Sequence, residues 1–303
     1  MDSLFTSIIK VAGSCGSPLT RNILDVYSQF RIDLKKNKAI DDFCLMKLCD
    51  DFMDNVIKSV ALYQKGRRSS AYEFFKDAMK LISPEIKEII KPIPHNVVLY
   101  RGRIGKEERT PQEMNHISLK KRYLVRTERY SFPGLPCLYL GDSVQVCLDE
   151  LKSAKEETQI ARFSTINTFN SYLYLDLACP FDYSVADIEN DLHLREKFIK
   201  ILPLIFCSSI KFDYPREDEE ARRVSFRSEY IIPQFLLQYL IEDMDHVVGI
   251  KYRSVLHIES GWKADGSKGV PMNNFVFPAI TTADVEISPL IDKLFLYGGI
   301  ERE

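Results

Sequence analysis

The segment from Arg129 to Glu150, which reads RYSFPGLPCLYLGDSVQVCLDE, carries three side chains that could act on one ligand. The guanidinium of Arg129 can grip phosphate oxygens in pairs. The ring of Tyr139 can stack on a flat ligand while its hydroxyl orients a sugar. The carboxylate of Glu150 can stabilise a positive charge that grows in a transition state. The set suits a ligand with a pyrophosphate at one end and a developing positive charge at the other.

The same segment predicts the local structure that presents these side chains. Two prolines and a glycine within 133–136 indicate a turn, and residues 137–140 (CLYL) indicate a short apolar strand. Asp142 or Ser143 is a natural N-cap for the helical run that follows. We therefore expect a compact loop, strand and helix, with Glu150 on the helix.

The composition excludes some classes of function. The chain has 303 residues, of which 45% are hydrophobic and 28% are charged, and its formal net charge is −2. It can bury a full core and hold one large or two small domains. The small net charge argues against a general nucleic-acid or membrane-surface binder, and no apolar run is long enough to cross a bilayer. We expect neither nucleic acid nor membrane as a partner.

The start of the chain and its cysteines predict the compartment. The first residues, MDSLFTSIIKVAG, place an acid at position 2 and a lysine inside the apolar run, which is the reverse of a signal peptide. The seven cysteines are an odd number in a chain that needs no disulfide staples. We expect a cytoplasmic protein with free, buried thiols. Four of the cysteines have apolar neighbours in the sequence: Cys44, Cys137, Cys147 and Cys207.

The first part of the chain predicts helices. Apolar residues recur at helical spacing over three stretches: 20–34, 40–60 and 71–82. Residue types typical of helix ends flank them: Ser17-Pro18, Gly66, and Ser69 or Ser70. Ser83-Pro84 indicates one more short helix, and the two prolines in 91–94 mark a connector. We predict a helical accessory or regulatory domain at residues 1–94.

Strands and helices mix after the connector. Strands are predicted at 97–100, 171–177, 247–252 and 274–277. Helices are predicted at 188–206 and at 217–243, the second interrupted near Pro233. This order is typical of an α+β domain, which we bound at residues 95–303.

Several common motifs are missing. No G-x-G-x-x-G follows a strand, and GWKADGSK at 261–268 has its lysine and serine in the wrong order for a P-loop. The five histidines lie without metal-ligand spacing, so we predict no metal. No histidine partner for a cysteine nucleophile is indicated.

Four pieces of the chain, in order, resemble the RES domain family, which is named for its arginine, glutamate and serine. They are LYRGR at 99–103, VRTERYSFPG at 125–134, LYLGDSVQVCLDEL at 138–151 and GIKYRS at 249–254. The later run SEYIIPQFLLQYL also looks like the family. The resemblance covers residues 95–280 and leaves the N-terminal helices unmatched.

The resemblance implies an ADP-ribosyltransferase-like fold that consumes NAD. Many RES proteins are toxins paired with an antitoxin, and they hydrolyse NAD, phosphorolyse it or ADP-ribosylate a protein. We therefore expect an NAD-cleaving toxin or defence effector, with water, phosphate or a protein as the acceptor of ADP-ribose. A different class remains open: an inactive RES-like fold that binds a nucleotide or a protein partner.

The resemblance also assigns roles to residues. It matches Arg101 and Arg129 to the family arginines, Tyr139 and Glu150 to its tyrosine and glutamate, and Ser254 to its serine. Glu150 would stabilise the oxocarbenium-like transition state that forms when the nicotinamide–ribose bond breaks. Ser254 would bind the carboxamide or position Glu150.

The pyrophosphate and the rings of NAD need further partners. Arg101 and Arg129 are the candidates for the pyrophosphate, with Arg103 and Arg253 in reserve. Tyr139 is the first choice for stacking on nicotinamide or adenine, and Tyr130 is the second. A charged insert, KEERTPQEMNHISLKKR, separates Arg101 from Arg129.

The N-terminal helices carry no candidate for chemistry. An uncontrolled NAD-degrading enzyme would poison its own cell, so we expect residues 1–94 to control the catalytic domain, by packing over it or by forming a homo-oligomer. An antitoxin or another regulatory protein would be a further partner. The alternative is a helical cap that only stabilises the protein.

Overall fold

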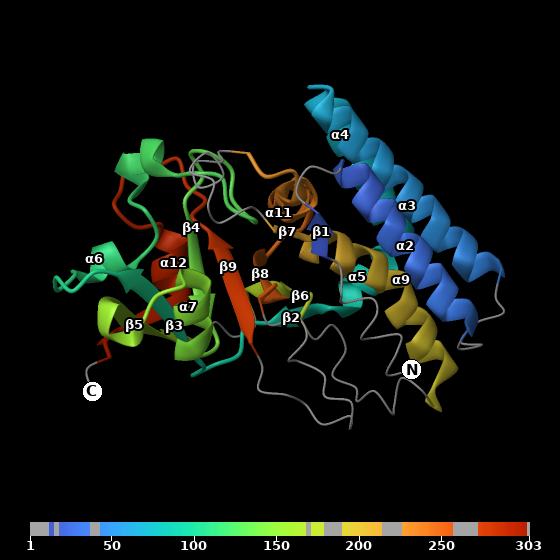
Figure 1. Cartoon of the computed structure of the whole chain (residues 1–303). Helices are drawn as coiled ribbons and strands as arrows, with labels where there is room; N and C mark the ends of the chain where they lie inside the picture. The colour runs from blue at the N-terminus through green and yellow to red at the C-terminus, as the bar shows by residue number, and fades with distance from the viewer. Residues whose placement is uncertain are drawn as a thin grey trace. The chain divides into compact units, whose positions relative to one another are not determined.

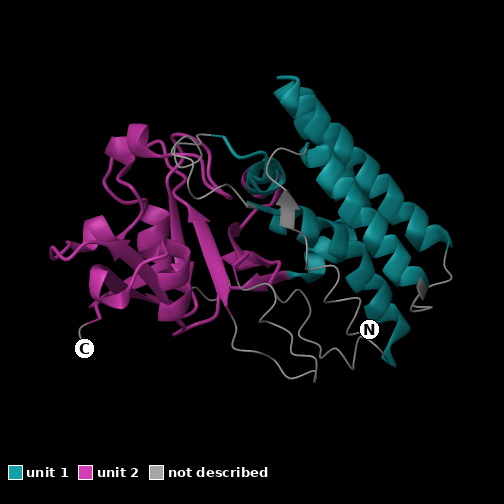
Figure 2. Ribbon diagram, in the orientation of Figure 1, with its two compact units in different colours: residues 1–89, 181–239, 259–269 teal, residues 90–180, 240–258, 270–303 magenta. Residues whose placement is uncertain are grey.

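The computed structural model describes most of the chain. The described residues are 12–14, 18–36, 43–167, 171–178, 190–213, 226–256 and 272–301. They divide into two compact units (Figure 2). Unit 1 comprises residues 1–89, 181–239 and 259–269, and unit 2 comprises residues 90–180, 240–258 and 270–303. Helices together with a mixed sheet confirm the predicted α+β class.

Unit 1 is mainly helical. Its helices are α2 (Leu19–Lys36), α3 (Phe43–Gln64), α4 (Arg68–Leu81), α5 (Ser83–Glu88), α9 (Leu192–Ser209) and most of α11 (Ile231–Asp243). Helices α2, α3 and α4 run side by side (Figure 1). A parallel pair of short strands, β1 (Ala12–Ser14) and β7 (Lys211–Asp213), and a 3-10 turn at Ser228–Tyr230 complete the described part.

Helix α9 belongs to unit 1, although it follows several strands of unit 2 in the sequence. The Cys49 thiol of α3 approaches the Ile199 carbonyl at 3.9 Å, and the rings of Phe30 and Phe206 lie 5.7 Å apart. The buried side of α9 is apolar, and it needs the N-terminal helices to cover it. Unit 1 is therefore not confined to the N-terminal segment.

Unit 2 is built on an eight-stranded sheet with the order β10-β5-β3-β4-β9-β8-β6-β2. The strands are β2 (Ile90–Pro92), β3 (Val98–Ile104), β4 (Cys137–Gly141), β5 (Thr158–Thr165), β6 (Leu173–Asp176), β8 (Val247–Arg253), β9 (Asn273–Pro278) and β10 (Phe295–Ile300). The helices are α6 (Pro111–Met114), α7 (Val144–Leu151), α12 (Pro289–Leu294) and the 3-10 turns Leu119–Leu124 and Lys155–Glu157.

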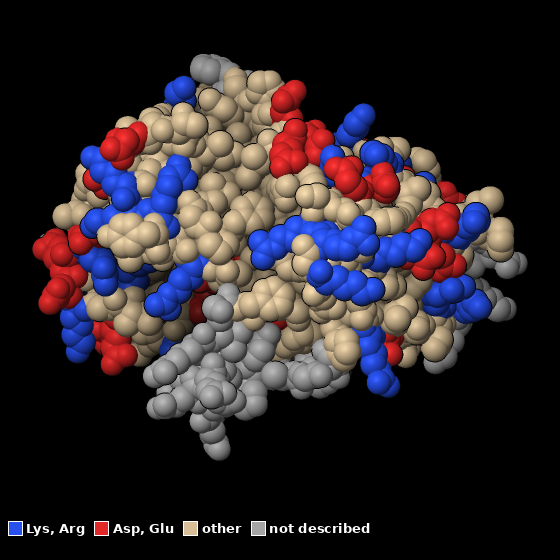
Figure 3. Space-filling view, turned by 90° about the horizontal axis from the view of Figure 1, so that it is seen from above, with Lys and Arg blue, Asp and Glu red and all other residues tan. Residues whose placement is uncertain are grey.

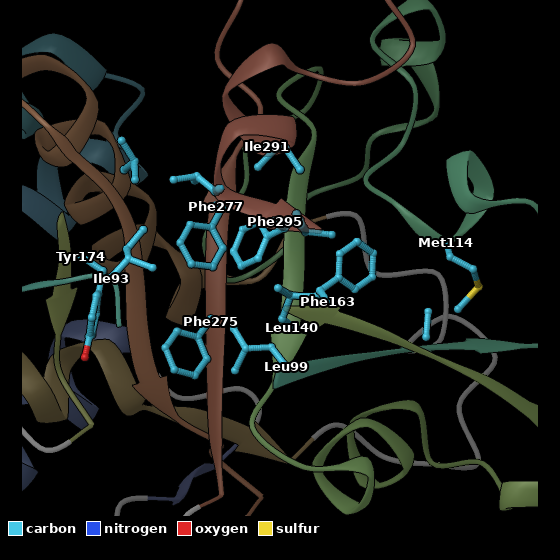
Figure 4. Close-up of a cluster of buried hydrophobic side chains, with 14 residues drawn as sticks. Ile93, Leu99, Met114, Leu140, Phe163, Tyr174, Phe275, Phe277, Ile291 and Phe295 are labelled. Atoms are coloured by element: carbon cyan, nitrogen blue, oxygen red, sulfur yellow. The ribbon is translucent and has the colours of Figure 1, made fainter. Parts of the chain in front are cut away.

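The two faces of this sheet are covered differently. On one face, Phe275 and Phe277, which are two residues apart on β9, point toward Leu140 and Phe295 in an apolar core (Figure 4). On the other face, α7 packs on β3 and β4 (Figure 1). Gly102 allows this close approach, because a Cβ there would lie 2.6 Å from Leu151 Cδ1.

The five predicted strands are found as β3, β4, β6, β8 and β9, and none of their ends shifts by more than four residues. Strands β2, β5 and β10 were not predicted; β5 and β10 extend the sheet beyond β3, and β2 forms its other edge. Ser143 is the N-cap of α7, since its hydroxyl accepts a hydrogen bond from Val146 N at 3.3 Å. The helix predicted at 217–243 begins, within the described residues, at Ile231 and passes Pro233 without a break.

Two local predictions are wrong. Helix α4 begins at Arg68, not after a cap at Ser69 or Ser70, because the chain turns at once at Gly66, whose φ is 78°. Cys44 is exposed on α3, whereas apolar surroundings were expected. The segment 261–268 lies outside the described residues.

Basic and acidic side chains are both spread over the face of the molecule seen in Figure 3. In the described part of the chain, no helix combines the length and the apolar character needed to span a membrane.

Candidate functional site

Glu150 is held in place by two hydrogen bonds that end on one oxygen. The Ser254 hydroxyl donates to Glu150 Oε1 at 2.7 Å, and Asn274 Nδ2 donates to the same atom at 2.7 Å. Both donors are buried, whereas Glu150 itself is exposed. In the described part of the chain, Oε2 accepts no hydrogen bond from the protein. The carboxylate is thus fixed through one oxygen and open to a ligand through the other.

Each of the three residues is positioned by a separate element of unit 2. Glu150 lies in the last turn of α7, which ends at Lys152 in a left-handed conformation with φ 51°. Ser254 follows β8, and its backbone N–H donates to the Met272 carbonyl at 2.9 Å. The Ser254 hydroxyl accepts from Leu256 N at 3.3 Å, which leaves its hydrogen for Glu150. The serine is therefore a donor of fixed direction.

The register of the sheet brings aromatic side chains to the same face. Asn274 pairs with Tyr252 of β8 on one side and with Gly141 of β4 on the other. Paired residues of antiparallel strands point to the same face, and so do residues two apart. Tyr139, which pairs with Val276, therefore shares the face of Asn274 and Tyr252.

Tyr130 and Tyr139 are linked by the loop before β4. The Tyr130 backbone N–H donates to the Tyr139 hydroxyl oxygen at 3.2 Å, and burial raises the pKa of Tyr139 well above its usual value, so the phenol is neutral. The Tyr130 ring is buried and lies 4.7 Å from the Tyr252 ring. Tyr252 is only half-buried, so it is better placed than Tyr130 to offer a ring to a ligand.

Two further arginines of the sequence analysis lie near this region. Arg129 is buried within the tight turn that the bridge between Glu128 and Ser131 closes. Arg253 is the last residue of β8, and its Nη2 donates to the Ala178 carbonyl at 3.3 Å.

Arg101 occupies a gap between two strands. Strands β3 and β4 pair only at Tyr100 and Gly141 among the described residues, and the Arg101 Nη1 donates to the Tyr139 carbonyl at 3.0 Å. The guanidinium thus satisfies a carbonyl that the parting strands leave free. Burial, and after it the charge of Arg103, holds the pKa of Arg101 well below its usual range. Contact of Arg101 with a pyrophosphate stays a prediction.

The structure unites some of the predicted residues and adds others. Glu150 and Ser254 are in direct contact, and Tyr139 shares their side of the sheet. Asn274 and Tyr252 were not among the residues predicted from the sequence. Both residues lie in strands that the sequence predicts, and this is the one feature that could have indicated them. Which face of the sheet they share depends on how those strands pair, and the sequence does not show that pairing.

Metal ligation finds no support in the described ranges, where no three histidine, cysteine or carboxylate side chains gather as ligands would. The absence of a metal remains an expectation.

Comparison with known proteins gives one informative match. A curated protein of Bacillus subtilis (strain 168), named "Putative toxin YopC", is 29% identical over 254 residues, which are 77% of this chain and 54% of the relative. The chain thus spans about half the length of the curated relative it matches. No family model matches the chain, and no solved structure gives a significant match.

Proposed function

We propose that unit 2 binds NAD and cleaves the bond between nicotinamide and ribose, and that the chain is a toxin of the RES type. The observation that carries the proposal is the Glu150 carboxylate, exposed to solvent and fixed through Oε1 by Ser254 and Asn274. The toxin name of the Bacillus subtilis relative supports the toxic role.

Glu150 would act by electrostatic stabilisation. As nicotinamide leaves, positive charge builds on the ribose in an oxocarbenium-like transition state. A carboxylate that is already oriented needs no reorganisation to meet that charge. Oε1 is held by two donors, so Oε2 is the oxygen that would face the ribose. Nicotinamide is a good leaving group, and this step requires no metal or general acid from the protein.

The neighbouring aromatic residues would hold the flat part of the ligand. Tyr252 lies on the face of the sheet that carries Asn274, and Tyr139 lies on the same face. Stacking on an aromatic ring is a common way to bind a planar heterocycle. The guanidinium of Arg129 and that of Arg101 would hold the pyrophosphate.

Product analysis tests the proposal and separates its forms. The full-length protein is incubated with NAD, in buffer with and without inorganic phosphate, and the products are resolved by chromatography and mass spectrometry. Nicotinamide with ADP-ribose indicates hydrolysis, and nicotinamide with a phosphorylated ADP-ribose indicates phosphorolysis. A mass increase on a protein indicates transfer to protein. Release of no nicotinamide under any condition would make the chain a binding module instead.

The toxic role has its own test. Expression of the wild-type chain in a bacterial cell should lower cellular NAD and stop growth, whereas the Glu150→Gln variant at equal abundance should do neither. Equal growth arrest by both proteins would show that toxicity does not depend on Glu150.

A further inference from the structure

A short turn of unit 2 presents two apolar side chains to solvent. In the 3-10 turn Leu119–Leu124, the side chain of Tyr123 is 81% exposed and that of Leu124 is 51% exposed. Ile280, in the loop after β9, is 44% exposed. Single exposed apolar residues are normal on a protein surface, whereas several together often mark a binding surface.

Hydrogen bonds hold the turn against the loop after β9. Arg122 donates from Nη2 to the Thr281 carbonyl at 2.7 Å. At the start of the turn, Leu119 N donates to the Glu286 carbonyl at 3.2 Å. Arg122 is the neighbour of Tyr123 in the chain, and Thr281 is the next residue after the exposed isoleucine. The apolar side chains of the turn and of the loop therefore belong to one surface.

The turn is also fixed within itself and to the loop before β4. The Ser118 hydroxyl accepts a hydrogen bond from Lys120 N at 3.2 Å, and Arg122 Nη1 donates to the Gly134 carbonyl at 3.0 Å. The apolar residue Val125, which follows the turn, is buried. A surface that is already ordered loses little conformational entropy when a partner binds.

Basic side chains accompany the exposed apolar ones. Residues 119–126 (LKKRYLVR) contain four basic residues and no acidic residue. Lys120, Lys121 and Arg126 are exposed. Lys120 Nζ lies 3.6 Å from Glu286 Oε1, whereas Lys121 and Arg126 form no salt bridge with any described residue. The surface is therefore positively charged as well as apolar.

We propose that this surface binds an acidic segment of another protein, and that an aromatic or aliphatic side chain anchors the segment. The surface is called the basic–apolar patch below, and it consists of Lys120, Lys121, Tyr123, Leu124, Arg126 and Ile280. Complementary charge would steer the acidic segment to the patch and fix its orientation. Tyrosine is a residue type that often carries a large share of the binding energy in protein interfaces.

The composition of the patch favours a protein over other negatively charged partners. Leu124 and Ile280 are aliphatic, so they can neither hydrogen-bond to a base edge nor stack on a base as an aromatic ring does. A six-residue turn and a loop do not form the long amphipathic helix with which proteins lie in a lipid surface. A polypeptide can meet both parts of the patch, because it offers carboxylates to the basic residues and apolar side chains to the others.

The test titrates the full-length protein with a random copolymer of glutamate and tyrosine, and with polyglutamate of the same length. The wild type should bind the copolymer roughly tenfold more tightly, because only the copolymer supplies an anchor. Lys121→Glu should weaken binding of both polymers about tenfold through charge repulsion. Tyr123→Ala should weaken binding of the copolymer about tenfold and leave binding of polyglutamate unchanged.

Arg67→Glu is the matched control for general attraction between opposite charges. Arg67 lies with Lys65 and Arg68 in the exposed basic turn between α3 and α4, which belongs to unit 1. This variant should bind both polymers like the wild type. An equal loss of binding in Arg67→Glu and Lys121→Glu, or equal affinity of the wild type for the two polymers, overturns the proposal.

The substituted side chains are exposed, so the variants should unfold at the wild-type temperature. Arg126→Glu and Leu124→Ser repeat the charge test and the anchor test at the other end of the turn, so the comparison stands if one variant is unstable. Arg126→Glu should behave like Lys121→Glu, and Leu124→Ser should behave like Tyr123→Ala. Wild-type binding of the copolymer by both of them would contradict the proposed patch.

A thymidine oligonucleotide and vesicles of phosphatidylserine test the other classes of partner. If either binds the wild type more tightly than the copolymer does, and loses affinity in Lys121→Glu, the patch is a nucleic-acid or membrane site and the proposal is wrong. Absence of copolymer binding to the wild type overturns it as well. These titrations need neither NAD nor turnover, so failure of this proposal and failure of NAD cleavage are distinguishable.

Discussion

The Ser254 hydroxyl donates a 2.7 Å hydrogen bond to Glu150 Oε1, although the two residues are 104 positions apart in the chain. Asn274 donates to the same oxygen from a third element. Three segments of unit 2 thus converge on one carboxylate oxygen. A carboxylate held in this way resembles a preorganised electrostatic site more than a solvated helix residue.

Ser254→Ala and Asn274→Ala should each lower the turnover number about tenfold, because a charged hydrogen bond that orients Glu150 is lost. Steady-state kinetics of nicotinamide release would measure the change, with KM affected less than the turnover number. Asn273→Ala is the matched control, since Asn273 Nδ2 donates to Asp142 Oδ2 at 2.8 Å and not to Glu150. Equal losses in Asn274→Ala and Asn273→Ala would argue against a specific role for Asn274.

A fragment of residues 95–303 should be poorly soluble. The fragment keeps α9 but loses α2, α3 and α5, which cover the apolar side of α9. It also loses the salt bridge between Lys200 of α9 and Glu85 of α5, whose charged atoms lie 2.9 Å apart. Large exposed apolar patches promote aggregation. Expression of the fragment, followed by gel filtration, checks this expectation. A soluble, monomeric fragment with native-like circular dichroism would show that α9 does not need the N-terminal helices.

The stability of the protein should fall in mild acid through His116. This side chain is buried, Nε2 accepts from Ser288 N at 3.0 Å, and burial lowers its pKa. The unfolded state therefore binds a proton more readily than the folded state. The free energy of unfolding is highest above the unfolded pKa of about 6.5 and falls as pH drops from there toward the folded pKa.

Urea unfolding between pH 7.5 and pH 5 measures this dependence. His116→Gln, which keeps an acceptor for Ser288 N, should show a shallower fall than the wild type. His95→Gln, at an exposed turn, should show the wild-type slope. Equal slopes for all three proteins would show that protonation of His116 does not limit stability.

Gly249→Ala should destabilise unit 2 by about 1–3 kcal/mol through overpacking. A Cβ at this position would lie 2.5 Å from the Phe277 ring and 3.0 Å from the Val276 carbonyl oxygen. Chemical denaturation measures the loss. If the ring is the obstacle, the double variant Gly249→Ala with Phe277→Leu should cost less than the sum of the single variants. If the losses in unfolding free energy simply add, the Phe277 ring is not the obstacle to the new Cβ.

The α+β class and five strands of the sheet could be predicted because apolar and β-branched runs are local signals. Strands β2, β5 and β10 were not predicted; the charged and polar residues of β5 obscure its alternation, and β2 is only three residues long. The roles of Asn274 and Tyr252 depend on strand register, which no local pattern carries. The place of Arg101 depends on the parting of β3 from β4, which is likewise a tertiary feature.

We propose that Glu150 stabilises the departure of nicotinamide from NAD. Glu150→Gln is the sharpest variant, because a glutamine oxygen can still accept from Ser254 and Asn274 while the negative charge is lost. Asp149→Asn is the control, since Asp149 neighbours Glu150 on α7 and accepts from Gln145 Nε2 at 2.7 Å.

The decisive measurement is the rate of nicotinamide release from NAD by the purified full-length proteins. We expect release by the wild type and by Asp149→Asn, and a rate lower by roughly 100- to 1,000-fold for Glu150→Gln with an unchanged melting temperature. Release by Glu150→Gln at the wild-type rate would contradict the assigned role of this carboxylate, and no release by the wild type would contradict NAD cleavage itself.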